Sequence, residues 1–182
     1  MTNQDIQFTC ADDVINDLIE SGVDIDIPVD IIKIAKHYNI EIRYDLESTD
    51  IIGEIFFDED KSPIIRVNQK KNSYNPRKRF TIAHELGHYF LHSFKSKMTF
   101  KDSLRNMSRK ESYWDKQERE ANNFAAELLM PTEPIFSECR KLIAGDDIPV
   151  DVFIQKIGDT FEVSNKAMEY RLLNLKILKR KS

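Results

Sequence analysis

The 182-residue chain lacks several features that mark specialised classes of protein. Its only cysteines, Cys10 and Cys139, are far apart, which excludes a disulfide scaffold and predicts two reduced core thiols. No apolar run could span a bilayer, and the first residues show neither the basic nor the apolar region of a secretory signal. The net charge of -4 gives no sign of the basic excess typical of nucleic-acid-binding proteins. We therefore expect a cytoplasmic protein whose partner is not nucleic acid.

The composition and periodicity that are present indicate a mostly helical globular protein. Hydrophobic residues make up 41% of the chain and charged residues 32%, which is ordinary for a folded domain. Apolar residues recur at helical spacing in several stretches, some of which end at glycine or proline. The predicted helices cover residues 11–21, 28–38, 77–92, 114–129, 132–143, 149–159 and 164–178.

Three shorter stretches, 40–44, 51–57 and 64–67, have the alternation or the β-branched content of strands. A polar turn joins the last two, which favours an antiparallel hairpin. We therefore predict an α+β fold, mostly helical, with a small three-stranded antiparallel sheet. Its main domain would cover residues 1–145, and residues 146–182 would form a helical segment packed on it.

The sequence His84-Glu85-Leu86-Gly87-His88 lies in the predicted helix 77–92 and matches the H-E-x-x-H pattern. Residues four apart share one helix face, so His84 and His88 can bind one zinc ion. Glu85 points roughly 100° away from His84 around the helix, so its carboxylate can reach a water on the metal. It could then take the proton of that water as a general base. The ordinary alternative is a surface pair of histidines beside a glutamate.

A catalytic zinc needs a third protein ligand, and the predicted helix 114–129 offers one. Glu118 lies at the edge of its apolar face, one turn before Asn122, whose amide could brace the carboxylate. Glu120 lies roughly 200° around the helix from Glu118, and we interpret it as a solvated charge. We therefore predict Glu118 as the third ligand.

Other residues near the motif have weaker signals. His92 continues the histidine face but lies too far along to complete a tetrahedral site, so we interpret it as structural. Gly87 costs the helix roughly 1 kcal/mol relative to alanine, which favours a close approach by a strand, a substrate or a partner helix. Tyr74, Tyr113 and Arg79 are candidates for stabilising the oxyanion, and each is also open to a structural interpretation.

Two blocks of the sequence resemble the ImmA/IrrE family of metallopeptidases. The first runs from Arg79 to His92 and contains the H-E-x-x-H pattern. The second begins at Glu118 and continues as Ala121-Asn122-x-Phe124-Ala125-Ala126-x-Leu128-Leu129-Met130-Pro131. Together they are specific, and the resemblance extends over about residues 25–175.

The resemblance implies a zincin-like fold and a gluzincin ligand set. In that set the third ligand precedes an Asn or Asp by four positions, which again indicates Glu118. The resemblance also implies a cytosolic protein substrate, namely a helix-turn-helix transcriptional repressor of a mobile element or stress regulon encoded nearby. The sequence does not distinguish Zn²⁺ from Mn²⁺ or Fe²⁺.

The C-terminal segment supports a competing interpretation. Its two predicted helices, with Ser164 as an N-cap between them, are similar to a helix-turn-helix. The second helix and the tail after it carry the basic residues Lys166, Arg171, Lys176, Lys179, Arg180 and Lys181, whereas the first helix has only Lys156. The chain could then be a DNA-binding regulator with a residual metal site, or a toxin–antitoxin-type protein that acts by binding alone.

Residues 93–112 lack periodicity and are rich in lysine and arginine. Because they connect the two predicted ligand helices, they must pass near the cleft. We expect Lys97, Lys101 and Arg105 to bind an acidic substrate segment, to belong to a lid, or to lie in a solvated loop.

Overall fold

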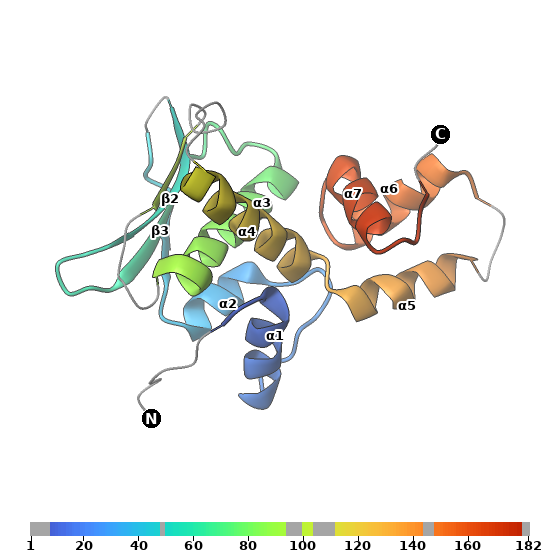
Figure 1. The fold of residues 1–182 in the computed structure, drawn as a ribbon, viewed down its shortest axis with the longest axis horizontal. Helices are drawn as coiled ribbons and strands as arrows, with labels where there is room; N and C mark the ends of the chain where they lie inside the picture. The colour runs from blue at the N-terminus through green and yellow to red at the C-terminus, as the bar shows by residue number, and fades with distance from the viewer. Residues whose placement is uncertain (1–7, 48–49, 94–99, 104–111, 144–147, 180–182) are drawn as a thin grey trace.

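The computed structural model describes residues 8–47, 50–93, 100–103, 112–143 and 148–179 (Figure 1). Its helices are α1 (Ala11–Glu20), α2 (Ile31–His37), α3 (Asn75–His88), α4 (Ser112–Leu129), α5 (Thr132–Ile143), α6 (Val150–Thr160) and α7 (Asn165–Asn174). A π-helical segment, η1 (Tyr89–Ser93), continues α3, and the strands are β1 (Glu41–Arg43), β2 (Ile51–Phe57), β3 (Pro63–Val67) and β4 (Phe100–Ser103). Figure 1 shows the strands at one end of the molecule and α5–α7 at the other. Among the described residues no helix is long and apolar enough to cross a membrane.

The predicted helices are all present, and capping residues explain two of their starts. Asp30 accepts hydrogen bonds from the backbone N–H groups of Ile32 and Lys33, both at 3.0 Å, so α2 begins after residue 30 rather than at 28. Ser164 caps α7, as predicted, by accepting from the N–H of Ala167 at 3.2 Å. Periodicity placed the helices well because each buries one apolar face.

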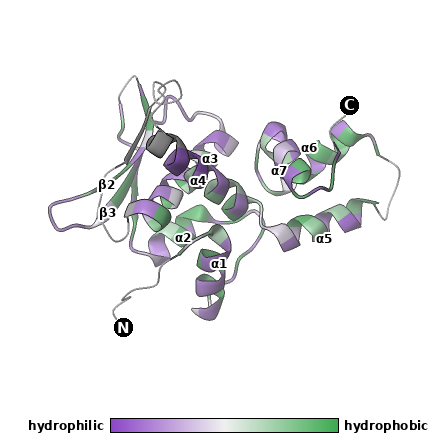
Figure 2. Cartoon of the chain, viewed as in Figure 1, coloured by the Kyte–Doolittle hydropathy of each residue, from purple (hydrophilic) through white to green (hydrophobic). Residues whose placement is uncertain are grey.

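The sheet has four strands in the order β1-β3-β2-β4 and is mixed. β2 and β3 form the predicted antiparallel hairpin, whose turn Figure 2 shows as hydrophilic. β1 pairs in parallel with β3, so the prediction of a purely antiparallel three-stranded sheet is wrong. An alternating pattern tells which face of a strand is buried, but not which strand it pairs with.

β4 is the strand that the sequence did not predict. It lies within the segment expected to be a basic loop, and it pairs antiparallel with the outer side of β2, with Phe100 opposite Ile55. Lys101 belongs to this strand. Lys97 and Arg105 lie outside the described residues, so a substrate-binding or lid role for this segment stays a prediction.

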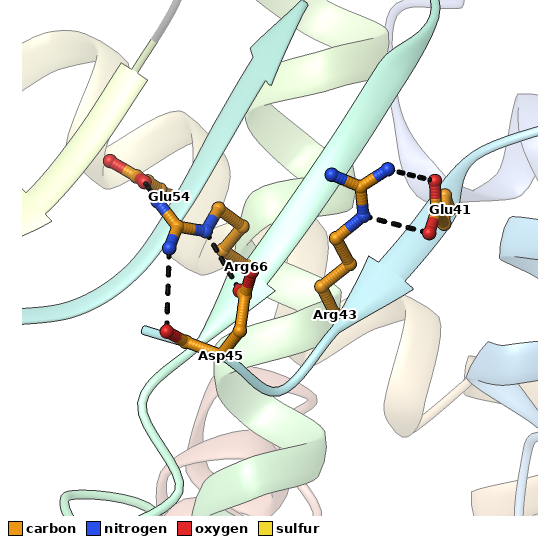
Figure 3. Close-up of polar contacts among 5 residues, drawn as sticks. All are labelled: Glu41, Arg43, Asp45, Glu54 and Arg66. Carbon is orange, nitrogen blue, oxygen red and sulfur yellow. Dashed lines mark hydrogen bonds and ion pairs between the residues drawn. The ribbon is translucent and has the colours of Figure 1, made fainter. Parts of the chain in front are cut away.

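Ion pairs connect the strands on the side of the sheet shown in Figure 3. Arg66 on β3 donates to Asp45 just after β1, at 2.8 Å, and to Glu54 on β2, at 3.0 Å. Glu54 is directly opposite Arg66 in the β2–β3 register and is only 4% exposed. Pairing with the guanidinium compensates for the burial of this carboxylate.

The core lies around α3, which packs against β2 and β3 on one side and against α4 on another. Ile82 and Leu86 of α3 and Phe124 and Leu128 of α4 are fully buried. Both cysteines are free, and Cys139 is buried in the core as predicted. Cys10 is not a core residue, because it is only half-buried at the start of α1.

The C-terminal helices contact the rest of the chain through buried arginines. Arg171 of α7 donates to the backbone carbonyl of Met130, at 3.0 Å, and to the hydroxyl of Thr132. Arg79 of α3 donates to the carbonyl of Val29 and pairs with Glu162, at 3.6 Å, in the turn before α7. The predicted domain boundary at 145 falls in residues 144–147, outside the described part of the chain, and stays a prediction.

Candidate metal centre

Three side chains from α3 and α4 converge on one point. His84 and His88 lie one turn apart on α3, and their Nε2 atoms are 3.0 Å from each other. The carboxylate of Glu118 on α4 places one oxygen 3.3 Å from His84 Nε2 and the other 3.2 Å from His88 Nε2. The three potential ligand atoms lie within 4.8 Å of one another. The structure thus brings together all three residues that the sequence singled out as metal ligands.

The second ring nitrogen of His84 fixes the protonation of its imidazole. Nδ1 lies 3.1 Å from the side-chain oxygen of Asn122, one turn beyond Glu118 on α4. Because an amide oxygen only accepts, Nδ1 carries the proton, and the lone pair of Nε2 faces Glu118. Asn122 therefore orients a histidine, and not the Glu118 carboxylate as the sequence suggested.

His88 is oriented by a chain of two further residues. Its Nδ1 lies 3.2 Å from Nδ1 of His92, and Nε2 of His92 lies 3.0 Å from a carboxylate oxygen of Glu120. Since the carboxylate accepts the Nε2 proton of His92, a neutral His92 accepts through Nδ1, and His88 donates to it. The lone pair of His88 Nε2 is thus also turned toward Glu118.

These contacts support the interpretation of His92 and revise that of Glu120. His92 is structural, as expected, since it contacts His88 and not the point where the ligand atoms meet. Glu120 is not simply a solvated helix charge, because it pairs with both His92 and Lys116. The π-helical turn η1 contains His92, and sequence patterns of period 3.6 do not signal such a turn.

The environment keeps the imidazole of His88 neutral and the carboxylate of Glu118 ionised. Burial lowers the pKa of His88 to about 4, against the opposing attraction of Glu118. Burial alone would raise the pKa of Glu118, but hydrogen bonds with His84 and His88, in the tautomers that carry a proton on Nε2, lower it to about 2. In the tautomers that carry the proton on Nδ1, a cation would take the place of these Nε2 protons between the two imidazoles and the carboxylate. This donor set fits a divalent cation that accepts nitrogen and oxygen ligands, as Zn²⁺ does.

Gly87 explains how α4 comes close enough to supply Glu118. A Cβ atom at this position would lie 3.0 Å from Cα and 3.1 Å from the carbonyl oxygen of Ala121 on α4. The sequence predicted a close approach at Gly87 and left its partner open, and the partner is a helix.

Glu85 is completely buried between α3 and β2. A Cβ atom at Gly53 of β2 would lie 2.9 Å from a carboxylate oxygen of Glu85 and 2.7 Å from the methyl group of Thr81. The absence of a side chain at Gly53 thus makes room for the Glu85 carboxylate between α3 and β2. The available signal was a glycine inside a strand pattern, which often marks a close approach.

A buried polar network fixes α3 against the start of β2. Thr81 donates to the side-chain oxygen of Asn72 at 2.8 Å, and Asn72 donates to the carbonyls of Ile52 and Asn68. The network holds Gly53 and Glu85 in register. No motif or periodicity in the sequence singles out Asn72.

The oxyanion candidates are placed differently from one another. The guanidinium of Arg79 contacts Val29 and Glu162, which favours its structural interpretation. Tyr74 is 58% exposed just before α3. The side chain of Tyr113 lies outside the described residues, so its role stays a prediction.

The basic face proposed for the C-terminal helices is smaller than the sequence indicated. The side chain of Arg171 is only 10% exposed and points toward α4 and α5. Lys166 is exposed but pairs with Glu169 at 3.3 Å. Arg180 and Lys181 lie outside the described residues, so DNA binding stays an untested alternative.

Comparison with known protein families adds an independent observation. A family model described as the IrrE N-terminal-like domain, within the peptidase family M78, matches residues 35–173. This match covers both metal-centre helices, α3 and α4, together with the C-terminal helices. No curated protein matches the chain significantly.

Proposed function

The chain belongs to the IrrE N-terminal-like domain family of peptidases, and from this membership and the geometry above we propose that it is a zinc-dependent metalloendopeptidase. His84, His88 and Glu118 hold the metal, one ion per chain. The observation that carries the proposal is the convergence of two imidazole Nε2 atoms and a carboxylate within 4.8 Å. Zn²⁺ suits this donor set, and Mn²⁺ or Fe²⁺ are outcomes that metal analysis would distinguish.

Bound zinc would supply Lewis-acid polarisation of the scissile carbonyl and would lower the pKa of the attacking water. The protein supplies the base. Glu85 accepts the proton of the water and returns it to the leaving amine as the peptide bond breaks. Its buried position against Gly53 limits its motion and excludes bulk water from its carboxylate.

The second ring nitrogens set the direction of the metal-facing lone pairs. Asn122 holds His84, and His92 with Glu120 holds His88, so both imidazoles present Nε2 without rearrangement. Partners of this kind typically change metal affinity tenfold to a hundredfold when they are removed.

We propose a cytosolic protein as substrate, specifically a helix-turn-helix repressor encoded next to this gene. Support for this comes from the sequence resemblance to ImmA/IrrE peptidases. A repressor of this kind has a single function to lose, so one cut between its DNA-binding and dimerising parts would be enough to inactivate it.

Metal analysis and one conservative substitution test the proposal. We expect about one zinc per chain in the native protein and in Glu85→Gln, and none in His84→Ala. Cleavage of the neighbouring repressor should fall at least a hundredfold in Glu85→Gln, because loss of a general base typically costs that much. Glu133→Gln, an exposed glutamate on α5, is the matched control and should cleave normally.

Three results would contradict the proposal. Full cleavage by Glu85→Gln would exclude the assigned base. A tight complex between zinc-loaded protein and repressor without any cleavage would favour a protein that acts by binding alone. Salt-dependent DNA binding that survives removal of zinc would instead favour the regulator.

A further inference from the structure

A cavity of about 600 Å³ lies between α3, α4 and α7. Its volume is within the range of pockets that bind small ligands or side chains. Two observations connect it to the proposed active site. Asn122 lines the cavity and also holds Nδ1 of His84, at 3.1 Å. Phe80 lines it one turn before His84, with 6.4 Å between the two ring centroids. Anything bound in the cavity would therefore contact two residues that touch His84, one of them at Nδ1.

The walls of this cavity are mainly apolar. Phe80 lines it from α3, Ala126 and Met130 from α4, and Val163 and Ala167 from α7 and the turn before it. Such a surface gains free energy by removing apolar groups from water, and it offers little to a polar or charged side chain.

Two tyrosines also line the cavity and expose much of their surface. Tyr74 precedes α3 and is 58% exposed, and Tyr170 on α7 is 52% exposed. Large aromatic side chains that stay exposed beside a hollow are typical of surfaces that bind another molecule. They give the cavity an apolar rim as well as an apolar floor.

The charged groups of the cavity largely compensate one another. Arg171 and Glu127 approach to 3.9 Å, and the guanidinium of Arg171 also donates to the carbonyl of Met130. Lys166 pairs with Glu169. Arg77 also lines the cavity, and both Arg77 and Lys166 are exposed, so solvent screens their charges.

We propose that this cavity is the specificity pocket of the peptidase, and that it takes a large apolar side chain, such as Leu, Met or Phe, next to the scissile bond. This rests on the proposed function, because Asn122 and Phe80 connect the pocket to His84, one of the proposed metal ligands. The cavity has room for such a side chain and for part of the neighbouring backbone. The C-terminal helices thereby form one wall of the substrate-binding site, since α7 and its preceding turn line the cavity.

The first test measures binding without catalysis. Zinc-loaded Glu85→Gln protein is titrated with capped dipeptides that carry either phenylalanine or alanine, and backbone amide shifts are followed by NMR. The phenylalanine peptide should shift the amides of Ala126, Val163 and Ala167, and the alanine peptide should not. The additional substitution Ala167→Phe, whose side chain fills the cavity, should weaken the binding of the phenylalanine peptide by about tenfold or more.

Two further variants keep this test interpretable. Ala126→Met fills the cavity from the opposite wall, in case Ala167→Phe fails to fold. Tyr170→Ala removes part of the rim, and Tyr44→Ala is its control. Tyr44 is 41% exposed, lies beyond β1 and does not line the cavity. The proposal is overturned if the phenylalanine peptide leaves the cavity amides unshifted, or if both filled variants bind it as well as the parent protein does.

The second test uses cleavage of a mixed peptide library by the active, zinc-loaded enzyme. Large apolar residues should be enriched at one position next to the cut bond, and in Ala167→Phe the preference should move to small residues.

Cleavage without this preference would overturn the proposal of a specificity pocket and leave the peptidase assignment intact. Apolar peptides that bind the cavity but are never cut would instead count against the proposed function and support the pocket as a binding site. Concentration-dependent dimers that are abolished by Ala167→Phe would assign the cavity to a second copy of the chain and overturn the proposal.

Discussion

The three histidines near the motif differ in role because each has a different neighbour at its second nitrogen. His84 meets an amide oxygen and His88 meets another imidazole, so both keep Nε2 for the metal. His92 directs its own Nε2 to Glu120 and so serves as a support. One residue type thus has two predicted functions, which both the spacing along the helix and the hydrogen bonding distinguish.

The buried state of His88 predicts how the metal-free protein responds to acid. Its pKa is about 4 in the folded protein, below the ordinary value of 6.5. Above pH 6.5 neither the folded nor the unfolded state binds the proton, so stability is at its full value. As the pH falls from 6.5 toward 4.5, the unfolded chain gains a proton that the folded protein cannot, and the free energy of unfolding should decrease by about 2 kcal/mol.

Urea unfolding in a chelating buffer across this pH range measures the effect. In His88→Gln the decrease between pH 6.5 and 4.5 should largely disappear. His37→Gln, which changes a histidine on α2 away from the metal centre, should keep the native slope. Equal slopes in all three proteins would rule out His88 as the cause.

At the scale of single residues, the sequence predicted the positions that belong to a motif and did not predict those that belong to none. His84, Glu85 and His88 follow from helical spacing, and Glu118 follows from its place on a second amphipathic helix. The contact from Asn122 to His84, the pairing of Glu120 with His92, and the clearance at Gly53 depend on how two elements approach each other. A single helix pattern contains no information on that approach.

Among the elements, the pair α3 and α4 decides whether a metal centre forms at all. Under the proposed function, one helix supplies two ligands and the base and the other supplies the third ligand, so the separation of the two helices controls the geometry. That separation is set where Gly87 meets Ala121. Close packing of this kind leaves little room for adjustment.

Gly87→Ala should therefore weaken zinc binding by about tenfold, even though alanine is a better helix former by roughly 1 kcal/mol. The new Cβ would lie 3.0 Å from the backbone of α4, which would have to move away from the histidines. Competition with a chromogenic chelator measures the affinity.

Gly22→Ala is the matched control for this experiment. Gly22 follows α1 with a φ of 76° and has open space around its Cα, so alanine there strains the backbone without touching another element. It should lower the free energy of unfolding by about 1 kcal/mol and leave zinc affinity unchanged. Unchanged affinity in Gly87→Ala as well would mean that the helix spacing tolerates an added methyl group.

The elements themselves were largely predictable, because burial of one face imposes its period on the sequence. Two features of the sheet are exceptions. β4 lies in a stretch with many charges, where pairing to β2 outweighs the local pattern. The parallel pairing of β1 is a property of the assembled sheet, since β3 separates β1 from β2.

For the molecule as a whole, attachment of the C-terminal helices depends strongly on Arg171. Its guanidinium reaches the carbonyl of Met130, at the end of α4, and the hydroxyl of Thr132, at the start of α5. The charged donor satisfies a carbonyl at a helix end that α4 cannot satisfy itself.

Arg171→Met should destabilise the packing of α6 and α7 by about 1–3 kcal/mol, because a charge-assisted hydrogen bond to a buried carbonyl is lost. Amide hydrogen exchange should become faster in α6 and α7, while zinc stoichiometry stays at the native level. Lys166→Met, on the exposed side of the same helix, should change neither. Native protection of α7 in Arg171→Met would show that apolar contacts alone hold the segment.

Three alternate residues of α4, at positions 118, 120 and 122, each contact a different part of the histidine row on α3 and η1. Slipping α4 by a single residue, or rotating it by one position, would break all three contacts simultaneously. Loading of the ion should consequently behave as an all-or-none event that reports on the alignment of the two helices. Bound zinc would then serve as a gauge of correct folding in this part of the chain, in addition to its chemistry.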